Sequence, residues 1–213
     1  MTRAALSAMI DEVMDEIENT TATDKYQIFC DLDGVLVSFT GGIEDAIRRE
    51  PPENASPRYI KAHAAAREAL GDQTLEEKHL NKNDEAFLKP VHNFMMRVMM
   101  NDRRFWMNLR WAPGGQELWD YIKKYDPIIL SKPTDLQAVI GKKKWVKDNL
   151  DLTGGRVQIR YNKSNYANHE GKTGLLIDDR EIETSAYDAA GGETILFKNV
   201  GQAIRDLKEY GFD

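Results

Sequence analysis

The sequence contains a single cysteine, Cys30, among its 213 residues. One cysteine cannot form a disulfide within the chain, which excludes the disulfide-stapled secreted domains and makes a reducing compartment the default. Runs of about 18 apolar residues, the length of a membrane-spanning helix, are also missing. The acidic N-terminus lacks the basic start of a signal or transit peptide. We therefore expect a cytoplasmic, unexported protein with no membrane partner.

Positive charge is scarce as well. The chain carries 29 Lys and Arg against 35 Asp and Glu, for a net charge of −6 and a pI near 5.4. Nucleic-acid phosphates are bound through an excess of Lys and Arg, so the composition argues against a nucleic-acid partner, whereas a small anionic substrate needs only a local positive pocket. The four histidines have no metal-ligand spacing and receive no catalytic role: His63, His79, His92 and His169.

The strongest signal for function is the pair Asp31 and Asp33 at the end of an apolar run. Ile28 to Cys30 reads as a short buried strand, with Cys30 as a small core residue, and Gly34 permits a sharp turn after it. The carboxyl ends of strands are where open α/β sheets bind ligands. The simpler interpretation is an Asp-rich turn that caps the next helix.

Three further apolar runs end in polar residues. Leu175 to Ile177 runs into Asp178 and Asp179, a pair that invites a hard cation such as Mg²⁺ or caps the following helix. Ile128 to Leu130 ends in Ser131, whose hydroxyl suits a phosphoryl oxygen or simply a proline-containing turn. Lys163 follows the strand predicted over 157–161, and its ammonium offsets charge on a carboxylate and a phosphate.

Four short motifs resemble, in order and in residue type, those of haloacid dehalogenase superfamily phosphatases. They are Asp31-x-Asp33-Gly34, Ser131, Lys163 and Asp178-Asp179. The chain is most similar to the 5'(3')-deoxyribonucleotidase group, including its bacterial and phage-encoded members, over roughly residues 26 to 200. Two departures stand out. Ser131-Lys132-Pro133 replaces the usual Thr-Ser-Pro, and Lys163 lies farther from the acidic pair than is usual, which leaves Lys172 as a rival.

The resemblance implies a Mg²⁺-dependent phosphomonoesterase that hydrolyses nucleoside monophosphates. Asp31 would attack phosphorus and Asp33 would act as acid and base. The remaining roles follow the motifs: Mg²⁺ ligands Asp31, Asp33, Asp178 and Asp179; phosphate-binding Ser131, Lys132 and Lys163; substrate-binding Phe39, Phe105, Trp106, Lys142 and Arg180. For Lys142, within a lysine run, a solvated helix face is the plainer interpretation.

Two alternatives remain open. One is a phosphatase for polynucleotide ends or other small phosphoesters, which would predict a basic groove leading to Asp31. The other, of a different class, is an inactive nucleotide-binding or interaction protein.

The order of elements predicts an α/β fold with an inserted helical cap. Residues 25–38 and 112–213 alternate strand and helix, as in a parallel sheet wrapped by helices, and the resemblance implies a Rossmann-like strand order of 5-4-1-2-3. Residues 39–111 contain no strand-like runs and are predicted to form an all-helical cap. Residues 1–24 form an amphipathic helix and a polar link, and the helix is a candidate homodimer contact. The helices expected are 42–50, 57–70, 75–80, 84–100, 115–124, 134–150 and 200–210; the strands are 28–30, 128–130, 157–161, 175–177 and 194–197.

Overall fold

The computed structural model describes residues 21–75, 85–101 and 103–213. The elements in chain order are α2 (Ala22–Lys25), β1 (Tyr26–Cys30), α3 (Phe39–Arg48), α4 (Pro57–Leu70), α6 (Glu85–Asn101), α7 (Arg103–Met107), α8 (Gly115–Ile122), β2 (Ile128–Ser131), α9 (Leu136–Leu150), β3 (Val157–Ile159), β4 (Asn168–His169), β5 (Lys172–Asp178), α10 (Glu181–Asp188), β6 (Glu193–Leu196) and α11 (Val200–Glu209). Short 3-10 helices cover Lys123–Tyr125, Gly154–Arg156 and Ser164–Tyr166. The N-terminal helix predicted before residue 20, and most of the helix predicted over 75–80, lie outside the described residues.

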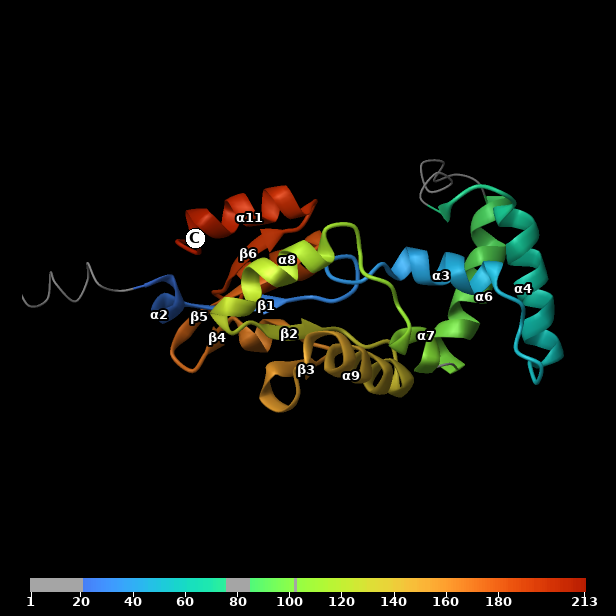
Figure 1. The fold of residues 1–213 in the computed structure, drawn as a ribbon, viewed down its shortest axis with the longest axis horizontal. Helices are drawn as coiled ribbons and strands as arrows, with labels where there is room; N and C mark the ends of the chain where they lie inside the picture. Colours follow the sequence, from blue (N-terminus) through green and yellow to red (C-terminus); the bar gives the residue numbers. More distant parts are fainter. Residues whose placement is uncertain (1–20, 76–84, 102) are drawn as a thin grey trace, which may run out of the picture.

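The described sheet has six strands, of which five are parallel and run in the order β6-β5-β1-β2-β3 (Figure 1). Counted along the chain without β4, this is the predicted order 5-4-1-2-3, which is confirmed. The two-residue strand β4 was not predicted and pairs antiparallel with the start of β5, within the stretch expected to be a polar loop. The central strand β1 pairs with a strand on each side, and its last three residues, Ile28 to Cys30, are buried because helices cover both faces of the sheet.

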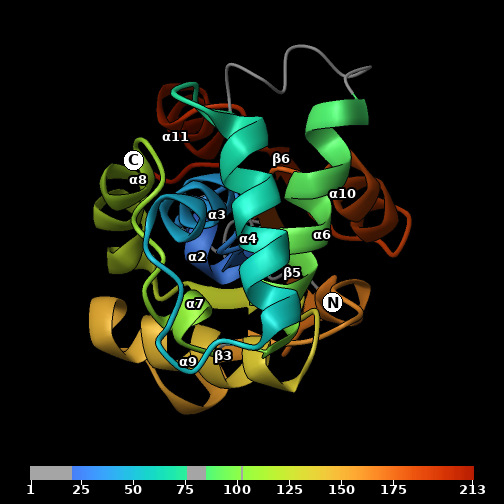
Figure 2. The ribbon, with the colours of Figure 1, turned by 90° about the vertical axis from the view of Figure 1, so that its right-hand side faces the viewer.

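The sheet buries a different set of side chains on each face, as the two-residue period of a strand requires. Phe29 and Leu176 pack on one face, with Tyr187 of α10. Ile28 and Ile177 belong to the larger core on the other face, to which α8, α9 and α11 contribute. Figure 2 shows α8 and α10 on opposite sides of the sheet. Helices on both faces give the predicted α/β architecture.

Helices α3 to α7 lie between β1 and α8 in the chain and gather at one end of the molecule (Figure 1). The chain enters and leaves this segment side by side: Ser38 N donates to Arg110 O at 2.9 Å, and Ala112 N donates to Leu36 O at 2.8 Å. α4 packs against α6, and α7 packs against α9 of the sheet region. The helical content agrees with the expected cap, whereas the division into domains stays a prediction. No described helix has the length and apolar character needed to cross a membrane.

Helix ends differ from the predictions where capping residues act. α3 begins at Phe39 rather than at residue 42 because the Ser38 hydroxyl accepts the Gly41 N–H. α9 begins at Leu136 rather than at residue 134 because Asp135 is its N-cap. The polar link expected up to residue 24 contains the short helix α2 instead. α4 covers the predicted 57–70, with Ser56 as N-cap and Pro57 in the first turn.

Gly115, the first residue of α8, tests the close packing of α8 against the segment after β1. A methyl group on Gly115 would lie 2.5 Å from the carbonyl oxygen of Leu36. That oxygen is backbone and already accepts the Ala112 N–H, so it cannot move aside cheaply. We expect Gly115→Ala to lower the free energy of unfolding by about 1–3 kcal/mol in urea titrations. Gly155→Ala is the matched control, because nothing lies within 4 Å of its added methyl. Equal stability of the two variants would contradict this account of the packing.

Candidate active site

Three neighbouring strands deliver polar side chains to one edge of the sheet. Asp31 directly follows β1, Ser131 ends β2 and Asp178 ends β5, and β1 lies between the other two in parallel register. Lys163 comes from the loop after β3. The structure therefore brings together the four positions that the sequence singled out.

Lys163 lies between two of these carboxylates. Its side chain is 2% exposed, and its Nζ is 3.0 Å from Asp31 Oδ2 and 2.5 Å from Asp178 Oδ2. The rival Lys172 lies at the other end of β5, where its ammonium donates to the carbonyl of Thr23. Lys163 is therefore the lysine of this site, and its partners neutralise a charge that burial alone would make costly.

Burial and the nearby charges shift the pKa values of two neighbouring carboxyl groups in opposite directions. Burial opposes ionisation of Asp31, but the charges of Lys163 and Lys142 outweigh it and hold the pKa of Asp31 below its ordinary value. Burial raises the pKa of Asp33 above its ordinary value; Lys142 opposes this rise, while the charge of Asp31 adds to it. An ionised and a protonatable carboxyl thus lie two residues apart.

Lys142 is buried, so the interpretation of its lysine run as a wholly solvated face is wrong at this position. Its Nζ donates to Asp33 Oδ2 at 2.6 Å, to Ser131 Oγ at 3.0 Å and to the carbonyl of Lys132 at 2.6 Å. The other oxygen of the same carboxyl, Asp33 Oδ1, is the only buried side-chain polar atom among the described residues that lacks a hydrogen-bond partner. A buried oxygen without a partner is uncommon in folded proteins and calls for an explanation such as a catalytic role.

Asp31, Asp178 and Asp179 form the acidic cluster. Each offers one carboxylate oxygen, and these oxygens lie within 4.8 Å of one another. Burial, together with the charges of Asp31 and Asp178, raises the pKa of Asp179 to about 6. An all-oxygen set with excess negative charge fits a hard divalent cation such as Mg²⁺. The helix-capping interpretation is not supported, because Arg180 is the N-cap of α10 and the Asp178 carboxylate accepts the Arg180 N–H before the helix begins.

Gly34 lets the turn after β1 pass directly beneath Asp179. Its φ is +78°, in the left-handed region that favours glycine. A methyl group on Gly34 would lie 2.1 Å from Asp179 Oδ2. The glycine of the first motif is therefore what allows the acidic cluster to close over the turn.

A cavity of about 510 Å³ opens above this group of residues. Of the twelve predicted site residues, eight line it: Asp31, Asp33, Phe39, Trp106, Lys132, Lys163, Asp179 and Arg180. The remaining four are buried and do not line it: Phe105, Ser131, Lys142 and Asp178. Phe105 supports the cavity from behind, with its ring centroid 5.7 Å from that of Phe39 and 5.1 Å from that of Trp106.

Five lining residues were not predicted: Gly34, Thr40, Pro133, Thr134 and Glu183. Glu183 is the most informative of them, because its Oε1 lies 2.9 Å from Lys132 Nζ and 3.6 Å from Arg180 Nη1. The sequence could have indicated Glu183 through its position three residues after Arg180, which is one helical turn beyond the acidic pair.

Comparison with known proteins gives likeness in structure only. No family model matches the chain, and no curated protein matches it. Among solved structures, it is similar to a hydrolase from Streptococcus pneumoniae TIGR4 (18% identity, 85% of this chain and 97% of that one, TM-score 0.47). It is also similar to a putative haloacid dehalogenase-like hydrolase from Burkholderia xenovorans LB400 (13%, 87% and 98%, 0.49) and to L-2-haloacid dehalogenase from Xanthobacter autotrophicus (10%, 89% and 84%, 0.45). Because these TM-scores lie below 0.5, the chemistry of the site has to be inferred from its own residues.

The contact between Gly34 and Asp179 predicts a specific energetic coupling. Gly34→Ala adds both backbone strain and a clash, whereas in an Asp179→Ala background only the strain remains. We expect Gly34→Ala to cost at least about 1 kcal/mol more unfolding free energy in the wild-type background than in the Asp179→Ala background. Urea unfolding of the four proteins of this double-mutant cycle measures the difference. A coupling of zero would contradict the contact.

Proposed function

We propose that this chain is a phosphomonoesterase that hydrolyses nucleoside monophosphates through an aspartyl-phosphate intermediate. The observation that carries the proposal is the opposite shift of the two neighbouring carboxyl groups, with the pKa of Asp31 lowered and that of Asp33 raised. Where the surroundings lower the pKa of one carboxyl group and raise that of its neighbour, the first is suited to act as nucleophile and the second as acid. The resemblance of the motifs to haloacid dehalogenase superfamily phosphatases supports the same assignment.

In the first half-reaction the Asp31 carboxylate attacks phosphorus, and the bond from phosphorus to the leaving oxygen breaks. Asp33 transfers its proton to that oxygen, so the product departs as a neutral alcohol. Lys163, held by Asp31 and Asp178, offsets the charge of the nucleophile, and its ammonium lines the cavity where the phosphoryl oxygens would lie.

In the second half-reaction Asp33, now ionised, takes a proton from water as the water oxygen attacks phosphorus. The bond from phosphorus to Asp31 breaks, which releases phosphate and restores both carboxyl groups. Lys142 fixes the Asp33 carboxyl through Oδ2 and leaves Oδ1 without a hydrogen-bond partner, so the carboxyl keeps one oxygen free to carry the proton.

Asp31, Asp178 and Asp179 would hold Mg²⁺, and the resemblance adds the backbone carbonyl of Asp33 as a further oxygen ligand. The cation would neutralise phosphate charge that the ammonium of Lys163, already shared between two carboxyl groups, cannot neutralise alone.

The far wall of the cavity suits a nucleobase. Phe39 and Trp106 line it, with ring centroids 5.7 Å apart and planes 31° apart. Trp106 is 1% exposed and supports this wall, whereas Phe39 is half-buried and offers the ring on which a base could stack. Lys132 and Arg180, on the opposite loops, supply positive charge at the cavity rim, partly balanced by Glu183.

We expect Asp31→Asn to abolish phosphate release while the protein stays folded, since the amide cannot act as nucleophile. Asp33→Asn should lower kcat by about 10²–10⁴-fold through loss of proton transfer. Asp188→Asn, an exposed carboxylate on α10, is the matched control and should retain full activity. Substantial activity in Asp31→Asn would refute the nucleophile assignment.

Substrate class and metal dependence are tested by phosphate release from a panel with Mg²⁺ or with EDTA. The panel holds ribo and deoxy nucleoside 5'- and 3'-monophosphates, a 3'-phosphorylated oligonucleotide and 2-chloropropionate, whose chloride release is followed. Metal-dependent release from mononucleotides is the expected result. Release from the oligonucleotide alone would move the assignment to polynucleotide ends, chloride release alone would move it to dehalogenation, and silence would favour an inactive binder.

The aromatic wall, formed by Phe39 and Trp106, predicts that loss of Phe39 lowers kcat/KM only for substrates that carry a base. Phe39→Ala should lower kcat/KM for nucleoside monophosphates by about 3–10-fold, the loss of one aromatic contact. The same variant should leave kcat/KM for ribose 5-phosphate, which lacks a base, nearly unchanged. Equal losses on both substrates would show that Phe39 supports the cavity without touching a base.

A further inference from the structure

A second set of cavities lies among helices α3 to α7, away from the acidic cluster. One of about 490 Å³ lies between α4 and α6, one of about 450 Å³ lies at the start of α4, and one of about 380 Å³ reaches α3 and α7. The first two share Arg58 and Arg97, and the last two share Pro52, Tyr59 and Arg104. We call this connected set the basic trough.

Its lining is strongly cationic in a chain whose net charge is negative. Six exposed cations line it: Arg49, Arg58, Lys61, Lys89, Arg97 and Arg104. Among the residues that the structure describes, the only acid in the lining is Glu50, whose carboxylate is already paired with Arg67 at 2.7 Å. Arg58, Lys61 and Lys89 form no ion pair within the described part of the chain. The trough therefore offers several cations to a ligand from outside.

Helix geometry explains the groove between α4 and α6. On α4 the lining residues recur as Arg58, Lys61, Ala62 and Ala65, and on α6 as Lys89, Pro90, Asn93 and Arg97, each set following one helix face. Figure 2 shows the two helices side by side at the end of the molecule that faces the viewer. Small residues on the floor and long cations on the rim leave a recess between them.

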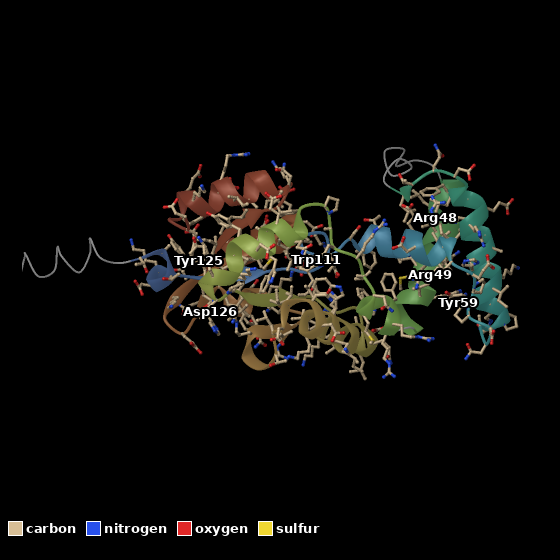
Figure 3. All side chains as sticks on the ribbon, viewed as in Figure 1. Arg48, Arg49, Tyr59, Trp111, Tyr125 and Asp126 are labelled. Atoms are coloured by element: carbon tan, nitrogen blue, oxygen red, sulfur yellow. The ribbon has the colours of Figure 1, made fainter. Side chains whose placement is uncertain are left out.

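The other end of the trough reaches the back of the candidate active site. Its last cavity is lined by Phe105, whose ring packs against Phe39 and Trp106 of the site's aromatic wall. Arg49 and Tyr59, labelled in Figure 3, line the same cavity. A ligand in the trough would thus lie on the opposite side of that wall from the substrate.

We infer that the basic trough binds a single-stranded polynucleotide through its phosphodiester backbone. A line of cations matches a regularly charged chain, and the exposed guanidinium of Arg58 presents a planar fork that suits phosphate oxygens. Each cavity has the size of a small-ligand pocket, which a flexible strand enters one nucleotide at a time and a rigid duplex or a bilayer cannot. The amide of Asn93, exposed on α6 between Lys89 and Arg97, can reach a base or sugar.

The net charge of −6 predicted no nucleic-acid partner, but net charge is a sum over the whole surface. The trough concentrates cations that are far apart in the sequence, so the local potential has the opposite sign. This inference does not depend on the proposed phosphatase activity, because binding in the trough involves none of the residues of the acidic cluster.

The test is fluorescence anisotropy of a labelled single strand of about 15 nucleotides, titrated with the full chain in EDTA, so that turnover plays no part. The paired variant is Arg58→Glu with Lys61→Glu, two exposed cations one helical turn apart on α4. The matched control is Arg205→Glu with Lys208→Glu, the same change at the same spacing on α11, which lies beside the sheet and away from α4 (Figure 1). Circular dichroism and activity on a small phosphoester check that each variant is folded.

We expect binding that weakens as salt rises from about 50 to 200 mM, with a slope reduced by about 1–2 in the α4 variant, in line with two lost phosphate contacts. Its affinity should fall at least about tenfold, while the α11 control stays within about twofold. The inference is overturned by absence of binding, by equal losses in both variants, by equal affinity for polyglutamate of the same length, or by tighter binding of the matching duplex.

Discussion

The buried ammonium of Lys163 is the interaction on which the site depends. It neutralises Asp31 and Asp178, which come from two different strands and would otherwise repel each other at the sheet edge. Because the three groups are almost wholly buried, removal of Lys163 would leave two carboxyl groups facing each other in a medium that solvates their charges poorly. The position of the acidic cluster and the low pKa of the nucleophile candidate therefore have one common origin.

Lys142 links the sheet to the helical segment by contacts to both. Its ammonium binds the Asp33 carboxyl and lies 5.0 Å from the centroid of the Trp106 ring. The neighbouring Gly141 lets α7 approach α9 so closely that a methyl group there would lie 2.3 Å from Trp106 Cβ. The aromatic wall is thus fixed to the same helix that fixes the acid candidate, and the cavity keeps its shape through these contacts.

Much of the sheet was predictable from sequence, and the walls of the site were less so. The apolar runs ending at Asp31, Ser131 and Asp178 identify strands and their carboxyl ends, because strand period and end chemistry are local properties. The burial of Lys142 was not predictable, since its lysine neighbours are solvated and only tertiary packing distinguishes them. Which aromatic face meets the cavity, Phe39 or Phe105, depends in the same way on helix packing. The basic trough gathers cations from residue 49 to residue 104, a grouping that no local pattern encodes.

The lone cysteine gives this chain a built-in reporter. Cys30 is fully buried in the central strand, next to Asp31, and burial raises the pKa of its thiol well above the ordinary value. A thiol in that state is inert to alkylating reagents until the strand is exposed. Its modification rate therefore follows the opening of the strand that carries the nucleophile candidate. A cysteine introduced at the surface can, for the same reason, be labelled selectively without removing the native one.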